Sequence, residues 1–563
     1  MKQKGFAWLL CAVLIFSAFA GCSGQGDKDK NSSAKADSSA SAAVSSQEAS
    51  LEEKSKEDSA GTPTDPFSPI VEEPLELSYY IRINDAMSST METYGDVEFF
   101  KMLEEKTHIH IKWDHNTSDE SFSMMIASGV YPDMINWVLN NAAGGVQTLL
   151  DDGVILDLTE LIPEFAPNYW LWLEKNPEDL KKPYQMEDGR LFQFIALMGD
   201  PDTQQMADYK TLGPQIRKDW LDKVGKEIPT TTDELHDVLL AFRDTDVNGD
   251  GDASDEVPFV VAKGMEALNA IAGSFGTRPD FHMDGEELVY GPMTDNFRKF
   301  LTYAHQLYAD GLINTDFAVN GDALMLITQN KAGFTIASMA SCLIANHEAL
   351  KLQDESYDYV SVPWLIGPDG RQSSMSNRGS NPRATAVTTT CKNPQAAVRW
   401  LDYAYSPKGA VEATFGIEGK SFEYRDGYPT ILESVRNNDK GWTEEQSISR
   451  WMLGAINYPM ARDYRFYEQM NLDQPYKVDI QTNWKLAKDD TVVPPATMST
   501  EEAAVYSGVV SDIKTFVDTS YQEFLIGEKS IETDWDAYVQ TIRDMGVQKA
   551  LDSRGAAIAR YNK

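Results

Sequence analysis

The sequence predicts an α/β fold, because two strand-like segments flank a helix-like one early in the chain. Residues 75–83 (LELSYYIRI) and 107–115 (THIHIKWDH) place apolar side chains at alternate positions, as expected of strands with one buried face. A helix is predicted between them, with Phe99, Phe100 and Leu103 on its inner face. Strand, helix and strand at this spacing form a βαβ unit with parallel strands.

Start signals for helices support the same fold class. Asp96 is expected to cap the first helix. A capping box (TTDE, residues 231–234) precedes a second helix, and Asn393 followed by Pro394 suits the cap and first position of a third. The last helix is expected from residue 535, where apolar side chains recur at helical spacing.

Residues 1–21 form a predicted signal peptide. Lys2 and Lys4 precede an apolar run over residues 6–19, which is short for a membrane span. The end of this segment, FAGC, resembles the bacterial lipobox, with Phe19 where leucine is usual. We therefore expect lipidation of Cys22, with a chain such as palmitate, and anchoring on the extracytoplasmic face of the cell membrane. A plain signal peptide cut elsewhere is the alternative.

Residues 22–66 are expected to form a disordered linker behind the lipidated cysteine. They are rich in Ser, Ala, Lys, Glu and Asp, and Val44 and Leu51 are their sizeable hydrophobic residues up to position 65. Such a segment buries too little apolar surface to order itself. As a flexible tether it would span about 35–40 Å r.m.s., and the lipid is the expected contact with the membrane.

Composition limits the partners of the folded part. The chain of 563 residues is long enough for two or more domains. Its 87 acidic and 50 basic residues give a formal net charge of −37, which argues against nucleic acid and against docking of a basic patch on anionic lipid. Two cysteines lie beyond the linker, Cys342 and Cys391, and either a disulfide or two buried thiols is open at this point.

An acidic loop at residues 244–256 predicts a structural Ca²⁺ site. Hard oxygen donors at alternate positions, with glycines that let the chain curl, suit this ion. One register starts at Asp244 with Gly249 at the sharp turn, and an alternative starts at Asp246 and ends on the last two acidic residues. A solvated acidic turn is the alternative to a metal site. The candidate ligands are Asp244, Asp246, Asn248, Asp250, Asp252, Asp255 and Glu256.

Several segments resemble those of one family, in the order in which the family has them. They are residues 124–137 (MMIASGVYPDMINW), 216–235 (IRKDWLDKVGKEIPTTTDEL), the acidic loop, 392–424 (KNPQAAVRWLDYAYSPKG and FGIEGKSFEY) and 524–561. The sequence resembles the family 1 extracellular solute-binding proteins of ABC importers, within them the large Gram-positive lipoproteins that bind oligosaccharides. The similarity runs from roughly Leu75 to Tyr561.

The resemblance implies a two-lobed, periplasmic-binding-protein-like α/β fold whose lobes are joined by hinge strands and close over a ligand. On this basis the N-terminal lobe is expected at residues 67–200 and 325–385. The C-terminal lobe is expected at residues 201–324 and 386–563, including the loop at 244–256. Crossovers between the lobes are expected near residues 192–201, 334 and 385.

Sugar binding needs aromatic platforms and side chains that offer paired hydrogen bonds. The chain has 12 tryptophans and 24 tyrosines. Core packing is the alternative role for Trp137 and Trp451, and Arg217 is either a ligand contact or a salt-bridge partner. The candidates for ligand binding are Tyr80, Arg82, Asn136, Trp137, Arg217, Arg378, Arg450 and Trp451.

The predicted function is capture of an oligosaccharide by a monomeric lipoprotein, followed by delivery to membrane permease subunits. The sequence has no GxxxxGK[ST] loop, so we expect the ATPase to be a separate subunit. No catalytic residue is predicted. The alternatives are a secreted glycoside hydrolase, which needs two carboxylates across a cleft, and a binding-protein receptor for a sensor kinase or for peptides.

Overall fold

The computed structural model describes residues 65–562 apart from short internal segments. The segments outside this description are residues 140–141, 143–144, 263–264, 318–322, 352–353, 375–382, 455–457, 472–474, 489–490 and 497. The expected signal peptide, Cys22, nearly all of the expected linker and Arg378 therefore lie outside the described residues.

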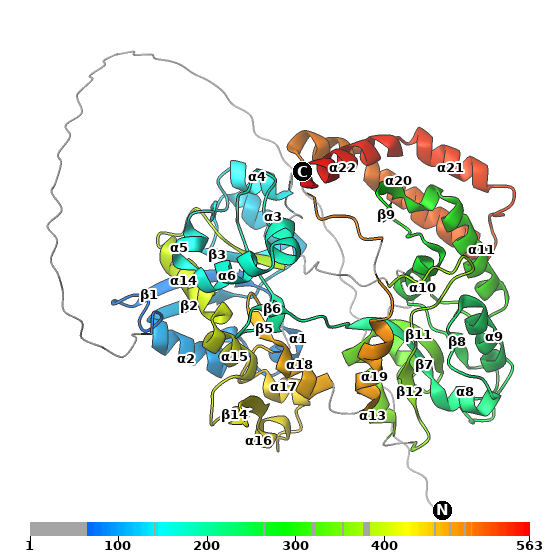
Figure 1. The fold of residues 1–563 in the computed structure, drawn as a ribbon, viewed down its shortest axis with the longest axis horizontal. Coiled ribbons are helices and arrows are strands. Elements are labelled where there is room, and N and C mark those ends of the chain that lie inside the picture. Colours follow the sequence, from blue (N-terminus) through cyan, green and yellow to red (C-terminus); the bar gives the residue numbers. More distant parts are fainter. Residues whose placement is uncertain are drawn as a thin grey trace, which may run out of the picture. The chain divides into compact units, whose positions relative to one another are not determined.

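A five-stranded sheet carries the first part of the chain, in the order β2-β1-β3-β13-β4. Its strands β1, β2 and β3 are labelled in Figure 1. β1 pairs in parallel with both β2 and β3, whereas β13 runs antiparallel to β3 and β4. The predicted βαβ unit is thus confirmed. The strands are β1 Leu75–Ile81, β2 Ile109–Asp114, β3 Met134–Val138, β4 Phe194–Ile195 and β13 Arg383–Val387.

Helix α2 (Glu98–Thr107) joins the first two strands and buries Phe99, Phe100 and Leu103, as its apolar spacing predicts. The expected cap at Asp96 is wrong. Asp96 ends a preceding 3₁₀ turn, where its carboxylate accepts from the backbone N–H of Thr93, so it is not placed to cap α2. Other helices of this part are α1 Asp85–Ser88, α3 Asp119–Ser128, α4 Gly145–Asp151, α5 Leu161–Phe165, α6 Pro167–Lys175, α7 Lys182–Tyr184, α14 Pro394–Asp402 and α15 Pro407–Phe415.

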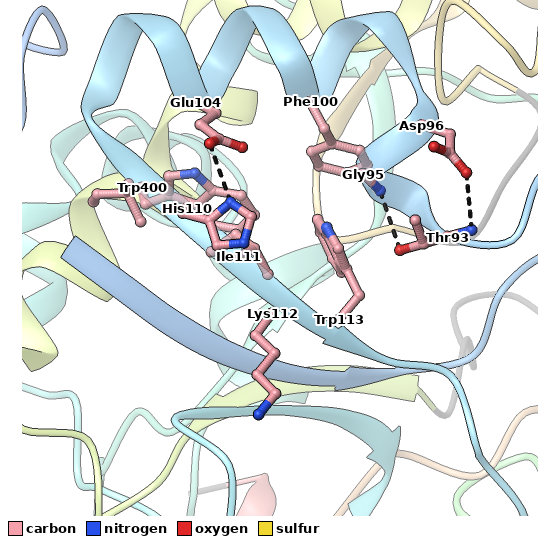
Figure 2. Close-up of a pocket in the computed structure, with 11 residues that line it drawn as sticks. Thr93, Gly95, Asp96, Phe100, Glu104, His110, Ile111, Lys112, Trp113 and Trp400 are labelled. Atoms are coloured by element: carbon pink, nitrogen blue, oxygen red, sulfur yellow. Dashed lines mark hydrogen bonds and ion pairs between the residues drawn. The ribbon is translucent and has the colours of Figure 1, made fainter. Parts of the chain in front are cut away.

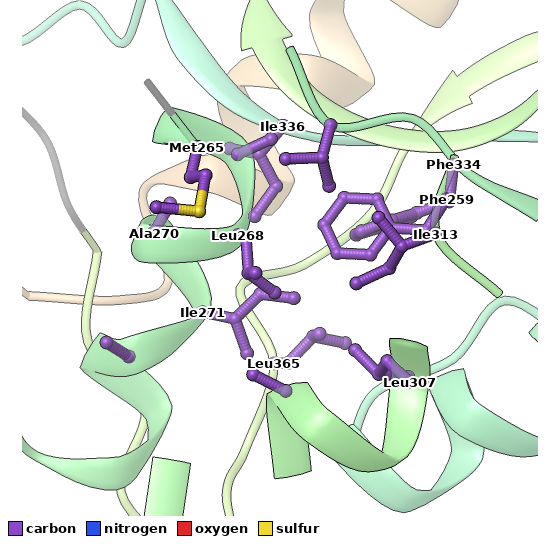
Figure 3. Close-up of a cluster of buried hydrophobic side chains, with 14 of the residues drawn as sticks. Phe259, Met265, Leu268, Ala270, Ile271, Leu307, Ile313, Phe334, Ile336 and Leu365 are labelled. Atoms are coloured by element: carbon purple, nitrogen blue, oxygen red, sulfur yellow. The ribbon is translucent and has the colours of Figure 1, made fainter. Parts of the chain in front are cut away.

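A second sheet has four strands in the order β12-β7-β11-β8. β11 is antiparallel to β7 and parallel to β8. Figure 3 shows its apolar core, where the rings of Phe259 and Phe334 lie 5.0 Å apart between centroids. The strands are β7 Leu212–Arg217, β8 Val257–Phe259, β11 Ala332–Ser338 and β12 Tyr359–Ser361.

The helices around this second core include two of those whose starts the sequence predicts. Thr231 and Glu234 form the capping box of α9, and α21 buries Trp535 and Tyr538. α21 is followed by α22, so the expectation that the last helix starts at 535 is wrong. The helices are α8 Lys218–Val224, α9 Thr232–Arg243, α10 Glu266–Ile271, α11 Asp295–Ala309, α12 Ala323–Thr328, α13 Ala345–Lys351, α19 Pro475–Trp484, α20 Thr500–Ile526, α21 Trp535–Asp544 and α22 Val547–Tyr561.

Smaller elements complete the fold. A three-stranded sheet has the order β16-β5-β6, and two hairpins pair β9 with β10 and β14 with β15. Their strands are β5 Leu197–Asp200, β6 Gln205–Met206, β9 Phe281–Asp284, β10 Glu287–Tyr290, β14 Phe422–Arg425, β15 Tyr428–Ile431 and β16 Ala461–Asp463. Helices α16 Glu433–Arg436, α17 Glu444–Ile448 and α18 Tyr464–Asn471 follow the second hairpin.

Two of the expected lobe assignments do not match the packing. β11, expected in the N-terminal lobe, pairs with β7 and β8 in the second sheet, because its alternate side chains complete that core. α14, expected in the C-terminal lobe, packs its apolar face into the core of the first sheet. The crossovers expected near residues 334 and 385 lie on strands β11 and β13 and stay a prediction. The remaining boundaries stay a prediction.

Cys342 and Cys391 are both buried and free, which settles the open pairing in favour of two thiols. Each lies in a different apolar cluster, Cys342 in the second core and Cys391 in the first. Burial raises the pKa of Cys342 to about 12 and that of Cys391 to about 11, so both thiols stay protonated. In the described part of the chain, no helix combines the length and apolar character that a membrane span requires.

Candidate ligand-binding site

Three strands of the first sheet bring candidate side chains together at one edge. Ile81 of β1 lies beside Asn136 of β3, and Val138 at the end of β3 lies beside Arg383 at the start of β13. Because β13 is antiparallel to β3, its first residue comes to the edge at which the parallel strands β1 and β3 end. Ligands of α/β sheets bind outside this carboxyl edge.

The ring of Trp137 forms the centre of this edge. Its centroid lies 6.0 Å from that of Tyr80, edge to face, and 4.6 Å from the guanidinium carbon of Arg383. Trp137 is 5% exposed and Tyr80 is 2% exposed, so both rings are packed in this conformation rather than offered as open platforms. Arg82, which follows β1, is exposed.

The start of α3 holds both rings in place. The hydroxyl groups of Tyr80 and Ser121 share a hydrogen bond of 2.8 Å. Trp137 Nε1 donates to Asp119 Oδ1 at 3.2 Å. Burial raises the pKa of Tyr80, so its hydroxyl remains a neutral donor and acceptor. The polar tips of the two aromatic residues are therefore fixed by one helix terminus.

Asn136 forms a hydrogen bond inside the sheet and does not take part in the edge around Trp137. It is buried, and its Nδ2 donates to Thr385 Oγ1 at 2.9 Å, which links β3 to β13. Thr385 Oγ1 also shares a hydrogen bond with the hydroxyl of Tyr79 at 2.5 Å. Of the predicted ligand residues, Tyr80 and Trp137 are thus in contact and Arg82 follows β1 at the same edge, whereas Asn136 lies in the strand interior.

Arg383 is a member of this edge that the sequence candidates omit. Burial lowers its pKa most, the neighbouring positive charge of Arg82 lowers it further, and Asp119 acts in the opposite direction. The sequence feature that could have identified Arg383 is its place at the start of a short strand-like segment, RATAV. The nearby arginine among the predicted ligand residues is Arg378, which lies outside the described residues.

Arg450 lines a separate cavity of about 450 Å³. Its guanidinium donates to the carbonyl oxygen of Thr90 at 3.2 Å and lies 5.2 Å from the ring centroid of Trp442. The next residue, Trp451, is half-buried against a small apolar cluster around Phe415. The other residues that line the cavity are Ser88, Ser89, Met91, Glu92 and Asp96.

Arg217 is a salt-bridge partner in this structure. It is 1% exposed, and its Nε and Nη2 donate to the two carboxylate oxygens of Asp219 at 2.8 and 2.6 Å. Its planar guanidinium lies between the rings of Trp220 and Tyr357, at 4.6 and 4.2 Å from their centroids. It therefore stabilises the second core, and it belongs to β7 and not to the strands that carry Trp137 and Tyr80.

A second hollow, of about 350 Å³, lies between α2 and β2. Figure 2 draws the residues that line it. Phe100, Trp113 and Trp400 supply its aromatic side. His110 and Glu104 pair across it at 3.1 Å. Trp400 and Phe100 are almost fully buried, as core residues are, so this hollow is a depression over the core of the first sheet.

The acidic loop folds around Asp246. The carboxylate of Asp246 accepts from the backbone N–H groups of Gly249 at 2.7 Å and Gly251 at 3.0 Å. Asn248 Oδ1 accepts from the N–H of Asp250 at 2.9 Å. Gly251 has a φ of +95°, which side chains other than hydrogen rarely permit. Gly249, the sharp-turn residue of the first register, likewise has a positive φ of +80°, so the backbone of the loop is compatible with both registers.

The flanking acidic residues separate into two kinds. Asp244 forms a bidentate pair with Arg243, and Asp255 pairs with Lys331 at 2.7 Å. Glu256 is buried, and among the described residues its Oε2 has no hydrogen-bond partner, while its Oε1 accepts from the N–H of Val247 at 3.0 Å. In the described part of the chain, no three His, Cys, Asp or Glu side chains converge as metal ligands.

Sequence comparison identifies relatives along most of the chain. The family of bacterial extracellular solute-binding proteins matches residues 88–411. The fructooligosaccharide ABC transporter substrate-binding protein FusA of Streptococcus pneumoniae serotype 4 (strain ATCC BAA-334 / TIGR4) is 25% identical over 471 residues, which are 80% of this chain and 84% of FusA. Lipoprotein LipO of Bacillus subtilis (strain 168) is 25% identical over 450 residues, 76% of this chain and 82% of LipO. The polygalacturonan/rhamnogalacturonan-binding protein YtcQ of the same strain is 24% identical over 357 residues, 60% of this chain and 66% of YtcQ.

Solved structures share the fold. The alginate-binding protein AlgQ2 superposes with a TM-score of 0.69 at 21% identity, covering 88% of this chain and 99% of AlgQ2. FusA of S. pneumoniae with kestose gives a TM-score of 0.66 at 22% identity, covering 86% and 99%. These likenesses confirm the predicted two-lobed, periplasmic-binding-protein-like α/β fold. With the family match over more than half of its length, the chain belongs to the bacterial extracellular solute-binding proteins.

Proposed function

We propose that the protein captures an oligosaccharide between its lobes and delivers it unaltered to the permease of an ABC importer. The observation that carries this proposal is the gathering of Tyr80, Arg82, Trp137 and Arg383 at the carboxyl edge of the first sheet. Aromatic rings and guanidinium groups are the partners that sugar rings and hydroxyl groups require. FusA and YtcQ, whose names state carbohydrate ligands, support the same class of ligand.

A thermal-melting screen over plant and microbial oligosaccharides tests this proposal. A ligand that binds only the folded protein raises its stability by about 2.7 kcal/mol when its concentration is 100 times the Kd. We expect at least one oligosaccharide to raise the melting temperature, and chromatography to recover the same oligosaccharide unshortened. Stabilisation by peptides and by no sugar would contradict the proposal and favour a peptide receptor.

The absence of catalysis is part of the proposal. A glycoside hydrolase places two carboxyl groups about 5–9.5 Å apart on either side of the scissile bond. At the candidate edge the carboxylate of Asp119 is engaged by Trp137 Nε1, and the neighbouring groups are guanidinium and aromatic. This arrangement favours binding over hydrolysis. Shortened sugar in the screen would establish the hydrolase instead.

The mature protein is proposed to be a monomeric lipoprotein, anchored through Cys22 on the extracytoplasmic face of the cell membrane, with a separate ATPase driving transport. The motif around Cys22 supports the anchor, and the relative LipO is named as a lipoprotein. Metabolic labelling with a palmitate analogue, followed by replacement Cys22→Ser, tests it. We expect labelling of the parent protein and release of the Cys22→Ser variant from the membrane.

Ca²⁺ is the proposed ligand of the acidic loop, in a structural role. The donor chemistry fits a hard cation, since Asp246, Asn248, Asp250 and Glu256 offer side-chain oxygens in the register that begins at Asp246. The buried, unpartnered Oε2 of Glu256 supports this, because burying a carboxylate oxygen without a partner is costly. One solved FusA structure is of an EF-hand mutant, which fits the same kind of loop.

A further inference from the structure

We propose that Arg560 and Glu187 form a clasp between the two lobes, an ion pair that holds the lobes at one separation in the ligand-free protein and breaks when they move. This inference goes beyond ligand capture and rests on it in one respect, because the lobes of a capturing protein have to open and close. The two residues lie on elements that pack into different apolar cores.

Glu187 lies in a tight turn that is fixed to the first sheet. The N–H of Met186 donates to the carbonyl oxygen of Arg190 at 2.8 Å, which closes the turn. Met186 is buried in the apolar cluster that contains Trp137 of β3. Asp188 pairs with Arg190 at 2.7 Å inside the turn. The carboxylate of Glu187 is therefore carried by a turn that moves with the first sheet.

Arg560 lies in the last turn of α22, which is fixed to the second core through Val547 and Ala550. Its Nη1 and Nη2 donate to Oε1 and Oε2 of Glu502 at 2.6 and 2.5 Å. Glu502 begins α20, where its carboxylate also accepts from the N–H of Ser499 in a capping box. The guanidinium group is thus held by its own lobe in one orientation.

The remaining donors of Arg560 reach the first lobe. Its Nε and Nη2 donate to the two carboxylate oxygens of Glu187 at 2.5 and 3.1 Å. The hydrogen bonds to Glu502 and to Glu187 raise the pKa of Arg560, so it remains charged. A second contact joins the same parts of the chain, because Lys182 Nζ lies 4.6 Å from the ring centroid of Tyr561.

The geometry decides how strongly this clasp acts. The side chains of Arg560 and Glu187 are 35% and 28% exposed, so water and salt weaken their attraction. An ion pair of this kind changes an equilibrium by up to about fivefold, and its bidentate form favours the upper end of that range. Two parallel hydrogen bonds need both groups aligned, so rotation of one lobe against the other breaks both.

Distances between two spin labels, measured by pulsed electron paramagnetic resonance, test the clasp. One label is placed at Ser123→Cys on α3 and the other at Ser511→Cys on α20, which are exposed positions on the two lobes. The protein is the mature chain with Cys22→Ser. Cys342 and Cys391 are buried and stay protonated, so they do not take up label. We expect one main distance in the ligand-free parent protein.

Matched variants assign that distance to the ion pair. Glu187→Gln should raise the fraction of molecules outside the main distance by about two- to fivefold, and Arg560→Gln should do the same. Asp188→Asn is the control, because it removes the same charge from the same turn while its partner, Arg190, lies in the turn itself.

Salt gives an independent readout of the same pair. Raising NaCl from about 0.1 M to about 1 M shortens the screening length from about 10 Å to about 3 Å. The parent protein should then approach the broader distribution of Glu187→Gln, whereas Glu187→Gln itself should change little.

The outcomes are decisive in both directions. Broadening in Glu187→Gln and Arg560→Gln but not in Asp188→Asn would support the clasp. Identical distributions in the parent protein and Glu187→Gln at both salt concentrations would overturn it, as would equal broadening in Asp188→Asn. The measurement uses no ligand, so a negative result here leaves oligosaccharide capture standing, and a negative ligand screen leaves the distance result standing.

Discussion

The guanidinium of Arg383 lies over the ring of Trp137, 4.6 Å from its centroid, while the indole N–H of the same ring donates to Asp119. Trp137 is therefore held from two sides by groups of opposite charge. These contacts cover the ring, and Trp137 is 5% exposed at the candidate edge. A ligand that contacts Arg383 would therefore lie next to a Trp137 ring whose position is already fixed.

A double-mutant cycle measures the bond between Trp137 and Asp119. We compare Trp137→Phe, Asp119→Ala and the double variant by urea unfolding. The coupling free energy should be about 1 kcal/mol in favour of the native pair, the typical net value of a hydrogen bond near the surface. A coupling below about 0.3 kcal/mol, the usual limit of additivity, would contradict the assigned bond.

The buried pair of Arg217 and Asp219 should be essential for the stability of the second core. Arg217→Ala leaves the carboxylate of Asp219 buried without its partner, which typically costs about 3–5 kcal/mol. The matched control is Arg425→Ala, whose pair with Glu423 is exposed and should contribute less than about 1 kcal/mol. Equal losses of unfolding free energy in the two variants would contradict the structural role of Arg217.

The acidic loop offers a test of register between two aspartates. Asp246→Asn should weaken Ca²⁺ binding by at least about tenfold, because Asp246 begins the turn and a carboxylate is the stronger ligand. Asp244→Asn should change Ca²⁺ affinity little, since Asp244 is engaged by Arg243. Calorimetry with CaCl₂ measures both. The opposite order would support the register that starts at Asp244.

Chelation should act on stability and not on specificity. We expect EGTA to lower the melting temperature, because the repelling carboxylates of the loop lose their counter-ion, while the order of ligand affinities stays the same. Loss of ligand binding at an unchanged melting temperature would show that the ion belongs to the ligand site instead.

Asp402 should make the first core sensitive to pH. It is fully buried, and burial raises its pKa from 3.8 to about 7, although it accepts hydrogen bonds from Asn168 and Tyr169. The folded-state pKa exceeds the unfolded one, so the native state holds more protons between these values. Its contribution to stability is therefore greatest below pH 4, falls as pH rises towards 7, and is constant above.

Comparison with the Asp402→Asn variant isolates the pH-dependent contribution of Asp402 to stability. From pH 4 to pH 8, the unfolding free energy of the parent protein should fall by about 4 kcal/mol relative to that of the variant. Urea unfolding at each pH measures it. Parallel pH profiles of the two proteins would show that Asp402 titrates at its ordinary pKa.

Two glycine-to-alanine changes should have opposite signs. At Gly213 in β7 a Cβ would lie 2.3 Å from the ring of the buried Trp484, so Gly213→Ala should lower the unfolding free energy by about 1–3 kcal/mol through overpacking. Gly508 lies in α20 with nothing within 4 Å of an added Cβ, so Gly508→Ala should raise it by about 0.5–1 kcal/mol. Thermal and urea unfolding measure both, and a tolerated alanine at 213 would contradict the packing of Trp484.

Local patterns were enough to predict the strands β1 and β2 and the start of α9. In β2, Ile109 and Ile111 are buried while His110 and Lys112 are exposed, so a period of two identifies the strand. The capping box of α9 depends on residues three positions apart, which any sequence displays directly. The cap predicted at Asp96 was wrong because the carboxylate of Asp96 accepts a hydrogen bond from Thr93, three residues earlier, in a separate turn.

Pairing between distant strands could not be predicted in the same way. Residues 332–336 of β11 are buried on both faces, so the strand shows no simple alternation that would distinguish the first sheet from the second. Arg383 was missed because its importance comes from its register opposite Val138, more than 200 residues away in the chain. For Arg217, the choice between ligand contact and salt bridge depended on Tyr357, which only the fold brings against it.

Native mass spectrometry of the protein incubated with a stabilising oligosaccharide decides whether the sugar is captured intact. We expect one complex of one protein and one intact sugar, whose mass is unchanged after prolonged incubation and whose sugar is recovered whole on denaturation. A complex that loses sugar units with time, or a protein that retains no oligosaccharide of any kind, would contradict capture of an intact sugar.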